Sequence, residues 1–371
     1  MRQVTNDPNP SVAFMPRLDG LRAVAIGGVL VEHFLPDSAI HRLSPGGAGV
    51  SLFFVLSGYL ITRILLQYRA QEVPVGTAAT HFYLRRILRL VPPYYLAIAV
   101  TFALGLHHMR SDWWVHALYL TNIRNAIFGT NGADHFWTLS IEEQFYLLWF
   151  FIAVAMPKPF LPWMILCAFL ITFVFRSGVY FLDLSPLTFR LLPGNLPTLA
   201  MGALVACAGE PGKVAKIDPL FRNKQLLIAS GLSFALLSFW LPPHAYAPYA
   251  FLYPFLAATF FGCVVRIAAD PYGERWLDWL GWAPVRHIGK ISYGIYVYHF
   301  FLPDLFIAFV PVLGNIVIKG GWSSFILLTV SSVLVAEISW YCMERPILRL
   351  KPTLSGKTMR GKEAFNILKS A

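Results

Sequence analysis

The chain has 371 residues, of which 57% are hydrophobic and 13% are charged, whereas charged residues make up roughly 25% of an ordinary soluble domain. It contains 30 Phe, 16 Tyr and 11 Trp, and its mean hydropathy is +0.58. A soluble protein of this size could not keep so much apolar surface away from water, and a disordered chain would be far more polar. The composition therefore predicts an integral membrane protein.

Apolar runs along the sequence predict an all-α fold, because a membrane-spanning helix needs about 20 mostly apolar residues. We expect a single bundle of about ten transmembrane helices in one membrane domain, 17–346. A polar N-terminus, 1–16, precedes this domain, and a basic tail, 347–371, follows it. The N-terminus lacks the apolar core of a signal peptide. The expected spans are 18–36, 49–66, 91–106, 137–156, 159–176, 191–209, 225–241, 248–268, 291–311 and 321–341.

The net charge of +11 is explained by topology, since cytoplasmic loops of membrane proteins collect lysine and arginine. With both termini in the cytoplasm, the inward loops and the tail hold most of the 30 lysines and arginines. The outward loops hold only Arg42, Arg110, Arg124, Arg176, Arg190 and Lys319. A basic chain can also indicate nucleic-acid binding. The charge distribution favours topology instead, and we expect no nucleic-acid partner.

The four cysteines predict neither disulfides nor a metal site. Cys167, Cys207, Cys263 and Cys342 lie far apart, inside or beside apolar runs, and form no CxxC pair. We expect no metal and no permanently bound cofactor.

The first span carries ionisable residues, which are costly inside a bilayer and indicate function by default. Arg22 and His33 are eleven positions apart, so they share one helix face and lie roughly 16 Å apart along the axis. Asp19, one turn before Arg22, can pair with it or cap the helix. The alternative is an ion pair at the membrane boundary, with His33 snorkelling at the outer end.

The next two segments carry small residues and then arginines. The first of them favours close helix packing, because it is rich in small residues: Gly46, Gly47, Gly49, Ser51, Ser57 and Gly58. Ser57 has no basic neighbour in sequence that would activate it as a nucleophile. Arg85, Arg86 and Arg89 follow at helical spacing, just before the proline pair expected to open the third span. Such arginines anchor a membrane protein on its inward side, but their forked side chains also suit a phosphorylated donor.

The segment DHFWTLSIEEQFYLLWF contains two adjacent glutamates at the expected outer boundary of the fourth span. Ser140 and Glu143 match a capping box, which gives Glu143 a structural role. Glu142 is not needed for that cap. With His135 and Trp137 just before them, the glutamates resemble an acceptor site more than a solvated helix face.

The ninth span begins with GKISYGIYVYHF, an aromatic stripe that ends in a histidine. Tyr293, Tyr296 and Tyr298 suit a helix core or an interfacial belt. His299 is an isolated intramembrane histidine, for which a structural and a functional role are equally supported.

Together these segments resemble acyltransferase family 3, a group of integral-membrane acyltransferases found mostly in bacteria. The resemblance runs from Arg17 to Pro346, through RLDGLRAVAI with His33, FFVLSGYLITRIL, FYLRRILRLVPPYY, FWTLSIEEQFYLLW and ISYGIYVYHF. It implies O-acylation, most often O-acetylation, of a sugar hydroxyl of a surface polysaccharide, a lipopolysaccharide or another glycoside. The implied location is the bacterial inner membrane, and acyl-CoA is the implied donor.

The resemblance and the residue chemistry define an expected site. A sugar hydroxyl needs a base, which His33 can supply, and polyanionic CoA needs cationic anchors. The expected catalytic residues are His33, Glu142 and Glu143. The expected donor-binding residues are Arg22, Arg86 and Arg89, and the expected acceptor-binding residues are His135, Trp137, Tyr296 and His299. A transporter or flippase could use the same buried charges, although the sequence lacks the internal repeat typical of that class.

Overall fold

The computed structural model of the protein describes residues 15–36, 38–130, 132–157, 160–184, 189–210, 213–240, 251–270 and 274–349. Within this part of the chain all regular secondary structure is helical, which confirms the all-α prediction. The polar N-terminus and the basic tail fall almost wholly outside the described residues. Their boundaries therefore stay predictions.

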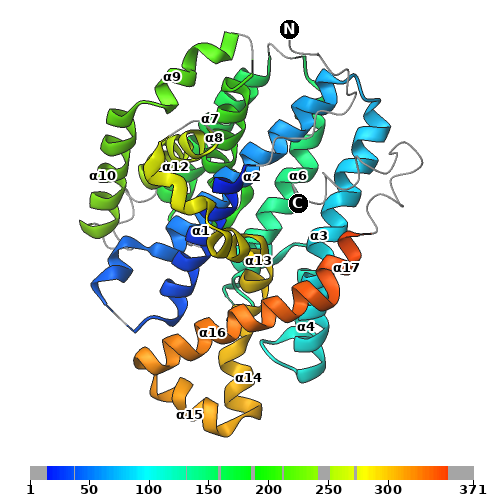
Figure 1. The fold of residues 1–371 in the computed structure, drawn as a ribbon, viewed down its shortest axis with the longest axis vertical. Helices are drawn as coiled ribbons and strands as arrows, with labels where there is room; N and C mark the ends of the chain where they lie inside the picture. The colour runs from blue at the N-terminus through cyan, green and yellow to red at the C-terminus, as the bar shows by residue number, and fades with distance from the viewer. Residues whose placement is uncertain are drawn as a thin grey trace.

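The ten expected spans all correspond to helices (Figure 1). These are α1 (Pro16–Phe34), α2 (Pro45–Ala70), α3 (Val75–Leu104), α6 (Phe136–Ala155), α7 (Leu161–Phe181), α8 (Leu192–Ala208), α10 (Lys224–Trp240), α12 (Tyr253–Ala268), α13 (Ala283–Tyr298) with α14 (Leu302–Phe309), and α16 (Gly321–Ser339). Six helical segments of the described chain are long and apolar enough to cross a membrane, and α8, α10 and α12 are shorter apolar helices. The polytopic membrane fold is thus confirmed.

Two spans differ from the sequence-based expectation in where they begin or break. The proline pair was expected to open the third span, but Pro92 and Pro93 lie inside α3, which begins at Val75. The arginines therefore belong to the same continuous helix as the span. The ninth span is interrupted by a 3-10 turn, His299–Phe301, between α13 and α14. His299 thus lies at a break in the helix.

Short helices cap the end of the bundle at which α1 finishes. They are α4 (Met109–Ala117), α5 (Thr121–Phe128) and α15 (Pro311–Lys319). Figure 1 shows α4, α14 and α15 gathered at this end, opposite α9 (Asp218–Phe221). An ion pair of 2.8 Å between His107 Nε2 and Asp304 Oδ2 joins the α3–α4 connection to α14.

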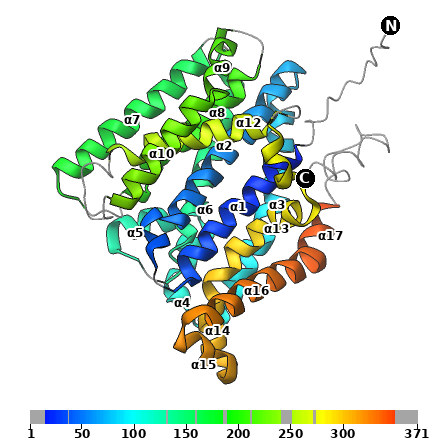
Figure 2. The same cartoon turned by 60° about the vertical axis from the view of Figure 1, so that its left-hand side comes forward.

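Helix α1 lies at the centre of the bundle, packed against both α2 and α13 (Figure 2). Glycines make these contacts possible. A Cβ atom on Gly49 would lie 2.3 Å from the carbonyl oxygen of Ala25, and one on Gly289 would lie 1.8 Å from that of Asp19. Helix α16 returns along α13, so the start of α1 and the end of α16 lie at the same end of the molecule. This arrangement agrees with the expected placement of both termini on one side.

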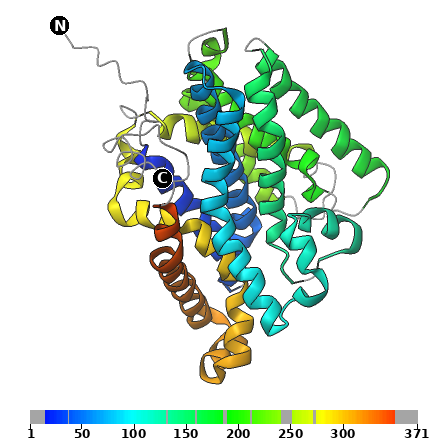
Figure 3. The same ribbon diagram turned by 90° about the vertical axis from the view of Figure 1, so that its right-hand side faces the viewer.

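The outer helices present apolar side chains outward, as a membrane protein must. On α16, Ile326, Val330, Leu334 and Ile338 form an exposed stripe at four-residue spacing. Helix α7 lies at the outer edge of the molecule and exposes Leu166, Leu170 and Val174 (Figure 3). Such apolar surfaces suit contact with lipid, where a charged side chain would be costly.

Candidate active site

Two cavities of different chemistry meet inside the bundle. The arginine cavity, of about 270 Å³, is lined by Arg22, Arg85, Arg86, Arg89, Glu142 and Tyr293, among others. The histidine cavity, of about 460 Å³, is lined by Glu32, His33, Asp134, His135, Trp137 and Arg190, among others. Val50, Phe54 and Tyr296 line both cavities, so these three side chains form the partition between them.

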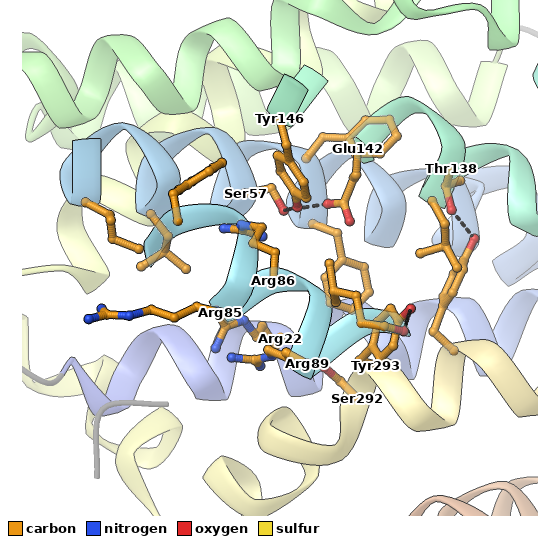
Figure 4. A pocket seen from close by; sticks show the side chains of 18 of the residues that line it. Arg22, Ser57, Arg85, Arg86, Arg89, Thr138, Glu142, Tyr146, Ser292 and Tyr293 are labelled. Carbon is orange, nitrogen blue, oxygen red and sulfur yellow. Dashed lines mark hydrogen bonds between the residues drawn. The ribbon is translucent and has the colours of Figure 1, made fainter. Parts of the chain in front are cut away.

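The arginine cavity receives cationic side chains from α1 and α3 (Figure 4). Arg22 Nη1 lies 2.5 Å from Asp19 Oδ1, so Asp19 pairs with Arg22, which is one of the two roles that its position allowed. The guanidinium carbon of Arg86 lies 4.0 Å from the centroid of the Tyr146 ring, a cation–π contact. The predicted donor-binding residues Arg86 and Arg89 on α3 therefore line one cavity with Arg22, which is more than 60 positions away in sequence, and with Arg85.

The arginine turn of α3 is followed closely by the proline pair. Prolines inside a helix remove backbone hydrogen bonds. Just before the pair, the Tyr293 hydroxyl donates a hydrogen bond of 2.8 Å to the carbonyl oxygen of Leu90. Because Leu90 directly follows Arg89, the hydrogen bond ties the arginine turn of α3 to α13.

A hydroxyl–carboxylate network lines the arginine cavity beside Arg86, which contacts the Tyr146 ring. Ser57 Oγ donates a hydrogen bond of 2.5 Å to Glu142 Oε1, and the Tyr146 hydroxyl donates one of 3.2 Å to Ser57 Oγ (Figure 4). Sequence reasoning missed this contact because Ser57 and Glu142 are 85 positions apart. The network fixes the orientation of the Glu142 carboxylate.

The expected capping box is wrong. Helix α6 begins at Phe136, so Ser140 lies inside the helix, where its hydroxyl donates to the carbonyl oxygen of Phe136. The glutamates are correspondingly not at the start of the helix. Glu142 faces the arginine cavity and not the predicted acceptor side, and Glu143 lines neither cavity.

His33 lines the second cavity with a defined ring tautomer. Its Nδ1 lies 2.9 Å from the carbonyl oxygen of Val29. Since a carbonyl oxygen can only accept, Nδ1 carries the proton and Nε2 of the neutral ring is an unprotonated acceptor. The expected base therefore has its basic nitrogen available. Arg22 and His33, expected on one face of α1, line different cavities on the two sides of the partition.

The predicted acceptor-binding residues gather around the histidine cavity. His135 and Trp137 line it, Tyr296 belongs to the partition, and His299 is fully buried beside His33. The Tyr296 hydroxyl lies 2.7 Å from Thr138 Oγ1 and donates to the carbonyl oxygen of His135 at 3.0 Å. These bonds hold the partition between α13 and α6.

Charged groups in the histidine cavity were not anticipated by the sequence analysis. Arg190 Nη1 lies 2.6 Å from both carboxylate oxygens of Asp134, and its guanidinium carbon lies 5.4 Å from the Trp137 ring centroid. Glu32 Oε2 accepts a 3.1 Å hydrogen bond from the Gly46 amide at the start of α2. Glu32 could have been predicted as a residue of this site, because it directly precedes His33 in sequence. The contacts of Arg190 could not, because they form only in the folded protein. Carboxylates and an aromatic ring are typical ligands of sugar hydroxyls and sugar faces.

The ionisable side chains of the described residues include no group of three or more His, Cys, Asp or Glu that could hold a metal ion.

Residues 15–341 match the acyltransferase domain family. The chain is 29% identical over 365 residues to the peptidoglycan O-acetyltransferase OatA of Listeria monocytogenes, covering 90% of this chain and 56% of that protein. It is 28% identical over 366 residues to the O-acetyltransferase OatA of Staphylococcus aureus, covering 91% and 58%. The chain thus spans a little more than half the length of these relatives. No solved structure matches the chain. With nearly its whole length matched, the chain belongs to acyltransferase family 3, a family of membrane acyltransferases.

Proposed function

We propose that the chain transfers an acyl group, in the first instance acetyl, from cytosolic acyl-CoA to a sugar hydroxyl of a surface glycan, in a bacterial inner membrane. The observation that carries this proposal is the pair of cavities, one cationic and one with an available imidazole nitrogen, meeting at a thin partition. The two relatives are named as O-acetyltransferases, and one of them as acting on peptidoglycan. A cell-wall glycan is therefore the first acceptor to test.

The arginine cavity suits the donor. CoA carries several phosphate charges, and arginine forks bind phosphate through two parallel hydrogen bonds. Arg86 and Arg89 on α3, with Arg22 on α1, supply such forks around one cavity. The axial distance from Arg22 to His33 is roughly 16 Å along α1. An extended pantetheine arm covers a distance of this order, so the thioester would reach the partition while the phosphates stay with the arginines.

The histidine cavity suits the acceptor and the transfer step. His33 Nε2 removes the proton of the sugar hydroxyl as its oxygen attacks the thioester carbonyl carbon. The tetrahedral intermediate then collapses with loss of CoA as a thiolate. The thiolate takes the proton back from His33, so the base is regenerated and the acyl ester remains on the sugar.

The acceptor itself would be held by the polar and aromatic walls of the same cavity. The Trp137 ring can pack against a sugar face, while Glu32 and Asp134 can accept hydrogen bonds from its hydroxyls. These walls contain two carboxylates and two arginines, Arg176 and Arg190. The cavity is therefore close to neutral, as a neutral sugar requires.

Purified protein incubated with [¹⁴C]acetyl-CoA and a soluble peptidoglycan fragment tests the proposal. We expect release of CoA and recovery of label on the glycan in an alkali-labile ester. A transporter or flippase would move its solute without releasing CoA, and that outcome would contradict the proposal. Comparison of glycan O-acetylation by NMR in wild-type and deletion strains would then identify the natural acceptor.

A further inference from the structure

Two polar side chains of the arginine cavity have no part in the proposed function so far. Arg85 lines the cavity with Arg22, Arg86 and Arg89, but it forms no ion pair within the described part of the chain. Tyr68 of α2 also lines the cavity, and its buried hydroxyl has no hydrogen-bond partner among the residues that the structure describes. Because a buried polar atom without a partner is rare and costly, this hydroxyl calls for a functional reason.

The chemistry of the two side chains selects an anion. Arg85 and Arg86 are the charged groups that act electrostatically on the Tyr68 hydroxyl. Guanidinium groups can only donate hydrogen bonds, so neither arginine can accept the Tyr68 proton. A phosphate oxygen can accept from a tyrosine hydroxyl and from a guanidinium at once, and such charge-assisted hydrogen bonds are strong. Tyr68 and Arg85 together therefore favour a phosphate group.

Tyr68 and Arg85 lie at the inward end of the cavity, far from the partition. Tyr68 is 14 positions after Phe54 of the partition on α2, which is roughly 21 Å along the helix axis. Figure 4 shows the Arg85 side chain extending away from the other labelled arginines, toward the end of the cavity opposite Thr138. Thr138 contacts Tyr296 of the partition. The two side chains therefore face a part of the donor that is distant from its thioester.

We propose that Tyr68 and Arg85 form a subsite for the 3′-phosphate of the CoA adenosine. This inference rests on the proposed function. CoA carries its pyrophosphate next to the pantetheine arm and its 3′-phosphate beyond it, on the ribose. The cavity has the same order, because Arg89 lies one turn of α3 closer to the partition than Arg85. The 3′-phosphate is a monoester with a charge of about −1.5 to −2 at pH 7, so it is the most highly charged of the three phosphates.

Acetyl-CoA and acetyl-3′-dephospho-CoA differ only in this phosphate, so their comparison tests the subsite directly. The measurement is the equilibrium Kd of each donor for the full chain in proteoliposomes, together with kcat for acetyl transfer. We expect wild type to bind the dephospho donor roughly tenfold or more weakly than acetyl-CoA. The kcat values should be similar, because the 3′-phosphate lies far from the thioester. A phospholipid headgroup offers the same phosphate chemistry, but a lipid at the subsite would not distinguish the two donors.

Four variants assign the discrimination to particular side chains. Tyr68→Phe removes only the hydroxyl, and Arg85→Ala removes the fork. Each should raise the Kd of acetyl-CoA severalfold and leave that of the dephospho donor nearly unchanged. Arg89→Ala should weaken both donors by a similar factor, so that their ratio is kept. Tyr83→Phe is the matched control and should change neither Kd, because Tyr83 lines neither cavity and its hydroxyl donates to the carbonyl oxygen of Leu147.

The results separate this inference from the proposed function. Equal affinities of wild type for the two donors would overturn the subsite. A ratio that is unchanged in both Tyr68→Phe and Arg85→Ala would also overturn it, because the 3′-phosphate would then bind elsewhere. Acetyl transfer by wild type would leave the proposed function intact in either case, whereas a wild-type protein that releases no CoA from either donor would overturn both. A ratio lowered in these two variants and kept in Arg89→Ala would support the inference.

Discussion

At the scale of single residues, the two halves of the site differ in what they can bind. Arginine keeps its charge in any environment and offers a planar fork, so it suits phosphate even when it is half-buried. Histidine can be neutral near physiological pH and can gain a proton during a reaction. The arginines on α3 and the histidine on α1 therefore have separable roles, and substitutions can distinguish them.

Substitution of Arg86 or Arg89 by Ala should raise the KM for acetyl-CoA, because each removes one phosphate-binding fork from the arginine cavity. Lys should restore binding only partly, since it offers a point charge without the fork. Acetyl-CoA titration of kinetics in proteoliposomes measures both effects. Arg275→Ala, an exposed arginine of the turn before α13, is the matched control. Unchanged KM values in both cavity variants would remove the anchoring role.

Glu142 and Glu143 should also separate, although for a different reason than the sequence suggested. Glu142→Gln removes a carboxylate that faces the arginine cavity and accepts a hydrogen bond from the Ser57 hydroxyl. Most acetyl-transfer turnover should therefore be lost. Glu143→Gln should be mild, because Glu143 lines neither cavity. The comparison requires kcat at matched protein levels. Losses of similar size in the two variants would argue against this division.

At the scale of helices, the close approach of two helix backbones decides where the side chains of the site lie. The backbones of helices α2 and α8 are in contact at Gly58 and Gly202. A Cβ atom on either glycine would lie 2.0 Å from a carbonyl oxygen of the other helix. Since α2 also carries Val50, Phe54 and Ser57, this contact sets the position of the partition. The shape of the two cavities therefore depends on Gly58 and Gly202, although neither residue lines a cavity.

Gly58→Ala should destabilise the protein by about 1–3 kcal/mol, because the added methyl group meets the Leu199 backbone and cannot be relieved by a rotamer change. Thermal unfolding in detergent measures the effect as a lower Tm. Gly27→Ala on α1 is the matched control, since a Cβ atom there meets no atom within 4 Å. Equal Tm values for the two variants would contradict the packing described for α2 and α8.

His116 on α4 gives a pH-dependent prediction away from the proposed chemistry. Burial lowers the pKa of His116 to about 4 from its ordinary value of 6.5, against a smaller opposing effect of Asp112. The unfolded chain therefore binds a proton that the folded protein excludes, so stability falls as the pH drops from about 6.5 to about 4. The loss is on the order of 3 kcal/mol at most. His116→Gln should flatten this part of the Tm profile. A wild-type slope retained in the variant would assign the effect to another group.

At the scale of the whole molecule, the sequence predicted much of the fold but only part of the site. The spans follow from apolar runs, and the shared face of Arg22 and His33 follows from helical periodicity. The contact of Ser57 with Glu142 could not be predicted, because no local pattern relates residues that meet only when α2 packs near α6. The capping box failed because Ser-x-x-Glu has the same spacing inside a helix as at its start. The actual start of α6 lies next to Asp134, whose pairing with Arg190 is a tertiary contact.

The division into a donor cavity and an acceptor cavity is tested most directly by His33→Ala in the purified, membrane-inserted protein. The measurement compares equilibrium binding of acetyl-CoA with acetyl transfer to the peptidoglycan fragment at saturating acetyl-CoA. Because His33 lies beyond the partition from the arginines, acetyl-CoA should bind with nearly wild-type affinity while turnover is lost. Retention of most transfer activity in His33→Ala, or loss of acetyl-CoA binding in a variant whose arginine cavity is intact, would contradict the account.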